Sequence, residues 1–186
     1  MPALLFISDK LNYLVQSVAR FANWFFIGMI ITICVDVVTR KFGLQIPHLN
    51  STRLQELEWH FHTGLFALWL GYAYVINQHV RIDIATMHLS LRKRAWIELI
   101  GCFLFAIPYA LVVTYFGIDF TYTSFMQNEI SDAGNGLPYR WIVKSLLAVG
   151  MIVLLLAIVA KILRLIVYLF AAQDLREHAV PFGGKE

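Results

Sequence analysis

The side chains with the richest chemistry lie at the two ends of one apolar stretch, residues 57–78. At its start, Glu56 and His60 are four residues apart, as are Glu58 and His62, so each pair can meet on one face of a helix. Carboxylates and imidazoles are groups that carry protons and ligate metals. The first question is therefore whether these pairs form a site or serve to pack the helix.

The other end of this stretch carries a second ionisable group, formed by His79, Arg81 and Asp83. Arg81 and Asp83 are two residues apart, so they would point apart on a regular helix, and we expect them to serve different partners across a turn. Ionisable residues are costly inside lipid and are functional candidates there, but the cost is smaller near the interface. The alternative is that the charges at both ends only mark the membrane boundary.

The pattern does not predict a catalytic, metal or haem centre. Haem in a four-helix core needs histidines that face each other, whereas His60 and His62 diverge and His79 lies at the opposite end. The EWHFH run also lacks the two histidines four apart that a zinc protease helix needs. We find no nucleophile with a base and no phosphate-binding glycine loop. We therefore expect no enzyme activity and no cofactor in this chain.

Composition indicates a membrane protein. The 186 residues are 59% hydrophobic and 15% charged, with a mean hydropathy of +0.67. Soluble domains are about half apolar and about a quarter charged, so the excess apolar surface must face lipid or other membrane helices. The net charge of +3 does not point to nucleic acid. Cys34 and Cys102 lie in apolar segments, and we interpret them as small core residues.

The predicted fold is an all-α membrane protein with four transmembrane helices. Amphipathic periodicity before the first span predicts a helix in the membrane surface; the alternative is a helix on the soluble side that packs on a partner. A short interfacial segment is expected between the second and third spans. Ser90 is expected to open the helix of the third span, and Pro108 is expected to kink it. Pro138 is expected in the first turn of the fourth helix, and Lys161 is expected to mark the far membrane interface of that helix.

A single membrane domain is expected over 1–172, followed by a cytoplasmic tail at 173–186. The domain comprises the interfacial helix at 3–20 and spans at 21–40, 57–78, 96–122 and 139–163, with 172 as the alternative end of the last span.

One side of the second span predicts close helix packing. His60, Gly64, Ala67 and Gly71 lie along this side, and small residues four apart let another helix backbone approach closely. The alternative is that the glycines are incidental. The middles of the spans hold almost no polar groups, and we find no internal repeat of the kind that transporters show. The residues by themselves thus indicate an accessory or scaffolding membrane subunit.

The run ELEWHFHTGLFALWLGYAYVINQHVRIDI resembles the signature of the small membrane subunit of tripartite ATP-independent periplasmic (TRAP) transporters. That family's second helix typically opens with Glu, Trp and His, as Glu56, Trp59 and His60 do here, and closes with a His-Val-Arg-Ile-Asp element. DVVTRKF and GLPYRWIVKSLLAVG are also similar to family patterns, and they are closest to the branch labelled for mannitol or chloroaromatic compounds.

This resemblance implies a bacterial inner-membrane subunit bound to a large multi-span subunit that carries the elevator-type transport machinery. A periplasmic binding protein delivers an organic acid, a sodium gradient drives uptake, and the sodium ions bind in the large subunit. Membrane lipids are the other expected partners. The alternative is a membrane-anchor or electron-transfer subunit of a respiratory complex.

Two sets of site residues follow from the pattern and the resemblance together. The expected subunit interface comprises Glu56, Trp59, His60, Gly64, Ala67, Gly71, Arg81 and Asp83. The expected docking surface for the binding protein comprises Arg53, Glu129, Asp132 and Arg140.

Topology gives a direct test of this scheme. Four spans put both termini on one side, and 10 of the 15 basic residues then fall on that side, which predicts cytoplasmic termini. Single cysteines introduced by Asn50→Cys and Asn135→Cys should therefore react with an impermeant reagent from the periplasmic side. Reaction of both cysteines only from the cytoplasm would contradict the predicted orientation.

Overall fold

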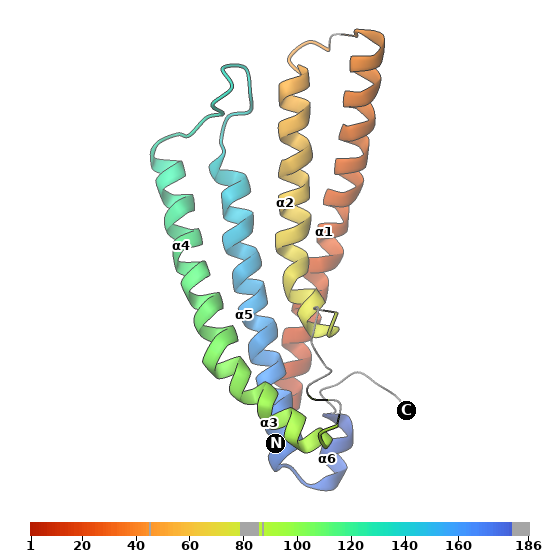
Figure 1. Ribbon diagram of the computed structural model, residues 1–186, viewed down its shortest axis with the longest axis vertical. Coiled ribbons are helices and arrows are strands. Elements are labelled where there is room, and N and C mark those ends of the chain that lie inside the picture. Colours follow the sequence, from red (N-terminus) through yellow and green to blue (C-terminus); the bar gives the residue numbers. More distant parts are fainter. Residues whose placement is uncertain (45, 79–85, 87, 180–186) are drawn as a thin grey trace. The chain divides into compact units, whose positions relative to one another are not determined.

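The computed structural model describes residues 1–44, 46–78, 86 and 88–179, and 81% of the described residues are helical. Within these ranges there is no strand, which confirms the all-α prediction. The helices shown in Figure 1 are α1 Pro2–Phe42, α2 Ser51–Val75, α3 Leu91–Gly101, the π-helix η2 Cys102–Ala106, α4 Ile107–Met126, α5 Trp141–Phe170 and α6 Gln173–His178.

Three helical stretches of the described chain are long and apolar enough to cross a membrane: Pro2–Phe42, Leu91–Met126 and Trp141–Phe170. The helix α2 is not among them. Its first turns carry charged and imidazole side chains, and it ends at Val75, three residues before the predicted limit. A fourth span therefore stays a prediction at this point.

The N-terminal region differs from the sequence prediction because α1 is one continuous helix. The sequence predicts an interfacial helix over 3–20 that is separate from a span over 21–40. No glycine or second proline occurs between Pro2 and Gly28, so nothing in the sequence stops the helix between the two segments. With 41 residues, α1 is about 60 Å long, roughly twice the thickness of a bilayer core. About half of α1 must therefore lie outside the hydrocarbon.

The buried side of α1 carries mostly small and medium-sized side chains. Ser8, Val15 and Ala19 are buried, whereas the large apolar residues Ile7 and Leu14 are exposed. Small side chains let a neighbouring helix approach closely, and large apolar ones can face lipid without cost. In a membrane chain, burial thus follows side-chain size as much as polarity.

Single residues mark the start of the third helix and an irregularity within it. Ser90 directly precedes α3, in agreement with its predicted position at the helix start. The π-helical turn η2 ends just before Pro108, whose missing N–H cannot bond to the carbonyl of Leu104. Cys102 in this turn is buried and lies 3.2 Å from the Tyr74 hydroxyl, as expected for a core residue. Cys34, in contrast, is exposed.

The start of α5 corrects one detail of the sequence analysis. Pro138 was expected in the first turn of a helix that starts near Tyr139, but α5 begins at Trp141. Tyr139 has a φ of +60°, a left-handed conformation that cannot continue an α-helix. The residues before Trp141 therefore belong to the preceding loop.

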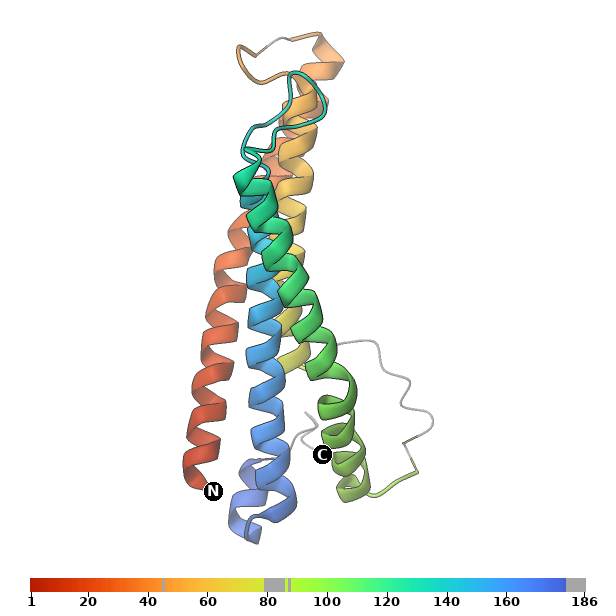
Figure 2. The same ribbon diagram turned by 90° about the vertical axis from the view of Figure 1, so that its left-hand side faces the viewer.

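The helices divide between two compact units. The first unit contains Met1–Ser17, Leu70–Val112 and Ile152–Glu186, and the second contains Val18–Trp69 and Val113–Met151. In the first unit the Ser8 hydroxyl donates a hydrogen bond to the Ala160 carbonyl oxygen (2.9 Å). In the second unit the helical segments run alongside one another in both ribbon views (Figure 1 and Figure 2).

The second unit is held together by very close helix contacts at glycines. A Cβ atom on Gly150 would lie 2.3 Å from the carbonyl oxygen of Ala67, and one on Gly64 would lie 2.6 Å from the Phe25 ring. Ala67 itself is buried. The small residues of α2 thus allow the close approach that their spacing predicts, and they do so with helices of this chain.

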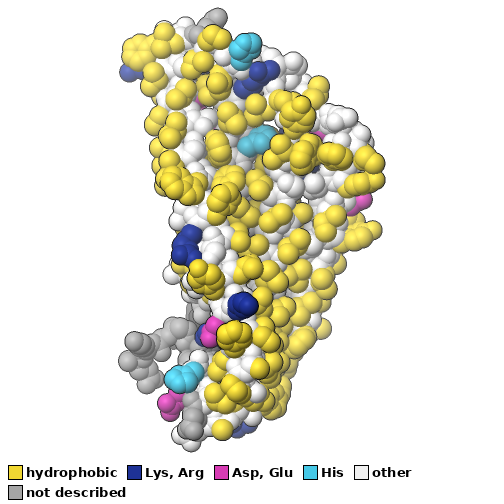
Figure 3. All heavy atoms as spheres, turned by 180° about the vertical axis from the view of Figure 1, so that it is seen from behind, with side chains coloured by type: hydrophobic (Ala, Val, Ile, Leu, Met, Phe, Trp, Pro, Cys, Tyr) yellow, Lys and Arg dark blue, Asp and Glu magenta, His cyan; other side chains and the backbone are white. Residues whose placement is uncertain are grey.

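The outer surface of the helices is strongly apolar. Hydrophobic side chains cover much of the face seen in Figure 3, and large residues such as Trp24 and Phe105 are exposed on α1 and η2. Exposed apolar area of this extent marks contact with lipid or with a protein partner.

The contact at Gly150 predicts a strong dependence on side-chain size. Gly150→Ala should lower the free energy of unfolding by about 1–3 kcal/mol, because the new methyl group would collide with the α2 backbone. The measurement is the midpoint of thermal unfolding of the purified chain in detergent. Gly101→Ala is the matched control, since its Cβ would meet no atom within 4 Å, and this change should be neutral or stabilising. Equal effects of the two changes would contradict the close contact.

Candidate functional site

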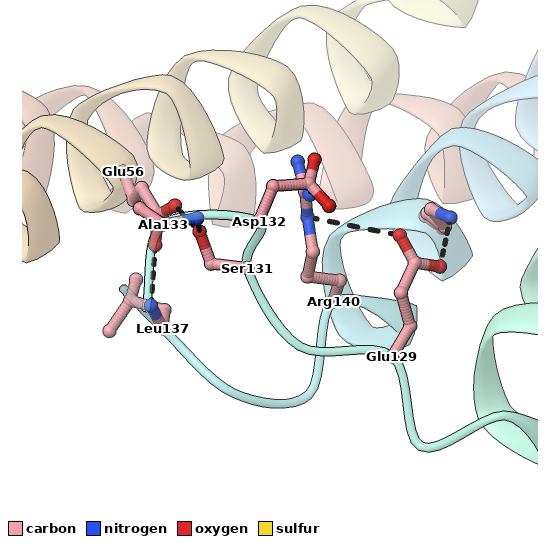
Figure 4. A network of polar contacts seen from close by, with 8 residues as sticks. Glu56, Glu129, Ser131, Asp132, Ala133, Leu137 and Arg140 are labelled. Atoms are coloured by element: carbon pink, nitrogen blue, oxygen red, sulfur yellow. Dashed lines mark hydrogen bonds and ion pairs between the residues drawn. The ribbon is translucent and has the colours of Figure 1, made fainter. Parts of the chain in front are cut away.

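A polar network joins the start of α2 to the loop of residues 127–140. The Glu56 carboxylate accepts hydrogen bonds from the Ser131 hydroxyl and from the Leu137 backbone N–H (Figure 4). The loop also closes on itself, because the Ser131 N–H donates to the Leu137 carbonyl oxygen (3.2 Å). One carboxylate from α2 therefore fixes both sides of the loop.

Local sequence explains the position of Glu56. The Asn50 side chain accepts a hydrogen bond from the Arg53 N–H (2.8 Å), which caps the first turn of α2. Glu56 lies in the next turn, outside the predicted span 57–78. Partial burial alone would raise the pKa of Glu56, but the hydrogen bonds from Ser131 and Leu137 outweigh it and hold that pKa below its usual value. The carboxylate is thus the charged acceptor in this network.

Gly136 completes the fit of the loop against α2. A Cβ atom there would lie 2.3 Å from the Ser131 hydroxyl oxygen and 2.7 Å from the second Glu56 carboxylate oxygen. Any larger residue would push the loop away from the carboxylate. The sequence analysis did not single out Gly136, since a glycine in a polar loop gives no sign of what it packs against.

Arg53 ties two loops together. Its Nε donates to the Asn135 carbonyl oxygen (3.0 Å), and its Nη1 donates to the His48 carbonyl oxygen (2.8 Å). Asn50 adds a hydrogen bond from its side-chain amide to the same Asn135 oxygen (3.2 Å). The guanidinium of Arg53 is therefore used to hold the loops, and its docking role stays a prediction.

The other three predicted docking residues lie together at the loop–α5 junction. Arg140 lies 4.0 Å from the Glu129 carboxylate and 3.5 Å from that of Asp132, as Figure 4 shows. Lys144 donates to Glu129, and this hydrogen bond is the main reason that the pKa of Glu129 is held below its usual value. Of the group, Asp132 alone is fully exposed, so its carboxylate is the one presented to solvent.

An aromatic ring lies against each of the two cations, Arg140 and Lys144. The Arg140 guanidinium lies 5.6 Å from the Trp59 ring centre, and the Lys144 ammonium lies 3.7 Å from that of Phe120. The Trp59 ring is also 4.0 Å from the His60 ring. The Trp59 and Phe120 rings and the two cations, with Thr63, Val143 and Leu147, line a hollow of about 230 Å³.

Two charged residues within the long helices, Asp36 and Lys161, are buried and paired inside their own units. In the second unit Asp36 is buried and pairs with Arg40, as their spacing predicts, and the Ser51 hydroxyl donates to the same carboxylate (3.0 Å). In the first unit Lys161 is only 6% exposed, and its Nζ lies 3.4 Å from a Glu98 carboxylate oxygen. The sequence analysis interpreted Lys161 as an interface marker. A lysine within a continuous apolar run was the signal that it needs a buried partner.

The remaining predicted interface residues divide into two groups. In the first unit a Cβ atom on Gly71 would lie 2.9 Å from a Val153 side-chain atom, so Gly71 packs within this chain. Arg81 and Asp83 lie outside the described residues, as do residues 79–85 and 87 of the predicted interfacial segment. Contact of the predicted set with a partner subunit stays a prediction.

Within the described ranges, no group of three or more His, Cys, Asp or Glu side chains is placed to hold a metal ion. The contacts described above are hydrogen bonds, ion pairs and ring contacts within this chain.

Comparison with known proteins identifies a family whose match covers the residues of this site. The chain matches a family described as "Tripartite ATP-independent periplasmic transporters, DctQ component" over residues 29–167, well over half of its length. The matched region contains all of α2, the loop 127–140 and the start of α5. No curated protein and no solved structure matches the chain.

The Glu56 network predicts that one side chain controls the order of the loop. Glu56→Gln should speed hydrogen exchange at the Leu137 amide by about five- to tenfold, the equivalent of about 1–1.4 kcal/mol, because a neutral amide oxygen is a weaker acceptor. Because the pKa of Glu56 is lowered, its contribution is complete at neutral pH and is lost as the pH falls through that lowered value.

The matched control is Glu58→Gln, two residues further along α2, which should leave exchange at Leu137 unchanged. Equal exchange rates in the wild type and in Glu56→Gln would show that the carboxylate does not hold the loop.

Proposed function

Because the chain belongs to the DctQ component family of tripartite ATP-independent periplasmic transporters, we propose that it is the small scaffold subunit of a sodium-driven transporter for organic acids. The family comprises transporter components and not enzymes. The match over residues 29–167 is the observation that carries the proposal, since it covers the second-helix motif and the structured loop.

The substrate passes through the large multi-span subunit, and this chain supports that subunit. The internal pairing of charges favours a supporting role for this chain, outside the path of the substrate. Asp36 is buried against Arg40 in one unit, and Glu98 is paired with Lys161 in the other, so neither carboxylate is free to bind a substrate or an ion. The sodium ions bind in the large subunit, and this chain holds no cofactor.

The chain crosses the inner membrane four times, with both termini in the cytoplasm. The loop between α1 and α2 spans only residues 43–50, so α2 must return from the side at which α1 emerges. With 25 residues, α2 is about 37 Å long, which exceeds the roughly 30 Å of a bilayer core. The N-terminal part of α1 extends past the hydrocarbon at the cytoplasmic surface.

The loop 127–140 contributes to the docking of the periplasmic binding protein. Glu56 holds this loop in one conformation, and a preordered surface loses less entropy on binding. Its exposed side chains include Asp132, Ile130 and Tyr139, a mixture of charge and apolar area that suits a reversible protein contact. Arg140 lies 3.5 Å from the Asp132 carboxylate and 4.0 Å from the Glu129 carboxylate.

The sequence likeness favours the branch labelled for mannitol or chloroaromatic compounds. The segments DVVTRKF and GLPYRWIVKSLLAVG carry that likeness, and both fall within or next to the matched region. The branch label does not by itself define the transported acid.

Reconstitution tests the proposal. Proteoliposomes that contain this chain alone should show no sodium-dependent uptake of an organic acid, and uptake should appear once the large subunit and the binding protein are both present. Omitting this chain from the complete system is the control and should reduce uptake. Strong uptake by this chain without the large subunit would overturn the proposed function.

A further inference from the structure

The start of α3 carries an exposed group of cations. Arg92, Lys93 and Arg94 are consecutive, and they form the longest run of basic residues in the sequence. Arg92 and Lys93 are exposed, and the first turn of α3 contains no acidic residue. All three residues belong to the first unit, so their arrangement does not depend on how the two units are placed.

The charges of Arg92 and Lys93 are not paired within the described part of the chain. Neither side chain forms an ion pair or a hydrogen bond among residues 1–44, 46–78, 86 and 88–179. The carboxylate of α3 itself, Glu98, lies 3.4 Å from Lys161. Cations in the first turn of a helix are also unfavourable, because the helix dipole is positive at that end. Neither internal pairing nor helix stability therefore explains these two cations.

The length of the helical stretch that begins with α3 places the cations at the edge of the hydrocarbon. Leu91–Met126 is apolar enough to cross a membrane, and its 36 residues extend over about 54 Å, against about 30 Å for a bilayer core. At least one end must therefore lie outside the hydrocarbon, and the charged end is the one that lipid headgroups and water solvate. Trp96, about one turn further along, is 40% exposed, as is usual for a tryptophan at headgroup level.

The face of α3 that continues from Lys93 is aliphatic. Its next members are Ile97, Ile100 and Leu104, at spacings of four, three and four residues, and all three are exposed. The distance from Lys93 to Leu104 is about 16 Å along the helix, close to the roughly 15 Å of hydrocarbon in one leaflet. A cation followed by an aliphatic face has the same order as the phosphate and acyl chain of a phospholipid.

Charge and composition favour a lipid over a protein at this face. Lysine is depleted in protein interfaces, and aliphatic side chains lose nothing when lipid covers them instead of protein. Basic residues grouped beside a membrane helix attract anionic phospholipids. The ligand that complements this surface is therefore a lipid with a net negative headgroup.

We propose that the start of α3 binds an anionic phospholipid, with Arg92 and Lys93 against the phosphate of its headgroup. The acyl chain lies along the aliphatic face formed by Ile97, Ile100 and Leu104. This inference goes beyond the proposed function, because it concerns a lipid ligand of this chain and not the passage of a substrate.

Lipid titration tests the proposal. The full chain is purified in detergent as the wild type, as the double variant Arg92→Gln with Lys93→Gln, and as the control Lys10→Gln with Lys41→Gln, which removes two exposed cations elsewhere. Native mass spectrometry measures the apparent Kd for phosphatidylglycerol and for zwitterionic phosphatidylcholine. The wild type should prefer phosphatidylglycerol. The double variant should bind this lipid about tenfold more weakly than the wild type, because both cations contribute to the attraction, and the control should match the wild type.

The other outcomes are distinguishable. Equal affinity of the wild type for the two lipids would overturn the proposal, and so would an equal loss in the control, since net charge alone would then account for binding. Equal thermal unfolding midpoints without lipid are expected, because both side chains are exposed. If the double variant unfolds, the single change Lys93→Gln replaces it and should weaken binding by about threefold. Unchanged lipid affinity with reduced recovery of the large subunit would assign this face to a protein partner and would also overturn the proposal.

Discussion

Charge in an apolar environment is the constraint on which the rest of this structure depends. The chain is 59% hydrophobic and yet carries charged residues within its helices, and an unpaired charge away from water is strongly destabilising. Asp36 pairs with Arg40 four residues away, whereas Lys161 finds Glu98 on a helix far away in sequence. Such pairs require the helices to stay in register. Each charged residue in these helices therefore requires a partner, and the partner also specifies how the helices pack.

Close backbone packing is the second means by which the helices are fixed. Lipid is as apolar as a leucine side chain, so helices in a membrane gain little from burying large apolar residues against each other. The second unit instead packs Gly150 against the Ala67 backbone and Gly64 against the Phe25 ring, and a methyl group added to either glycine would collide with these atoms. Large apolar side chains remain on the outside, where lipid or a partner subunit can cover them.

These two features explain how a small chain serves a larger transporter. Paired charges and tight contacts give stable helices, and the Glu56 carboxylate extends that order into the loop 127–140. The loop can then present Asp132 and its apolar neighbours to a soluble partner without first becoming ordered.

The sequence by itself determined the fold class, the membrane setting, the Asp36–Arg40 pair and the likeness to the transporter family, because composition and short spacings are local properties. It also located the start of α3 and the irregularity at Pro108, which depend on single residues. Its separate helix over 3–20 was not observed, since no residue there stops a helix.

Only the tertiary structure decided that Lys161 is buried against Glu98, that Arg53 holds two loops and that Gly136 fits against Glu56. Each of these contacts joins residues distant in sequence, and no local pattern records which helices become neighbours.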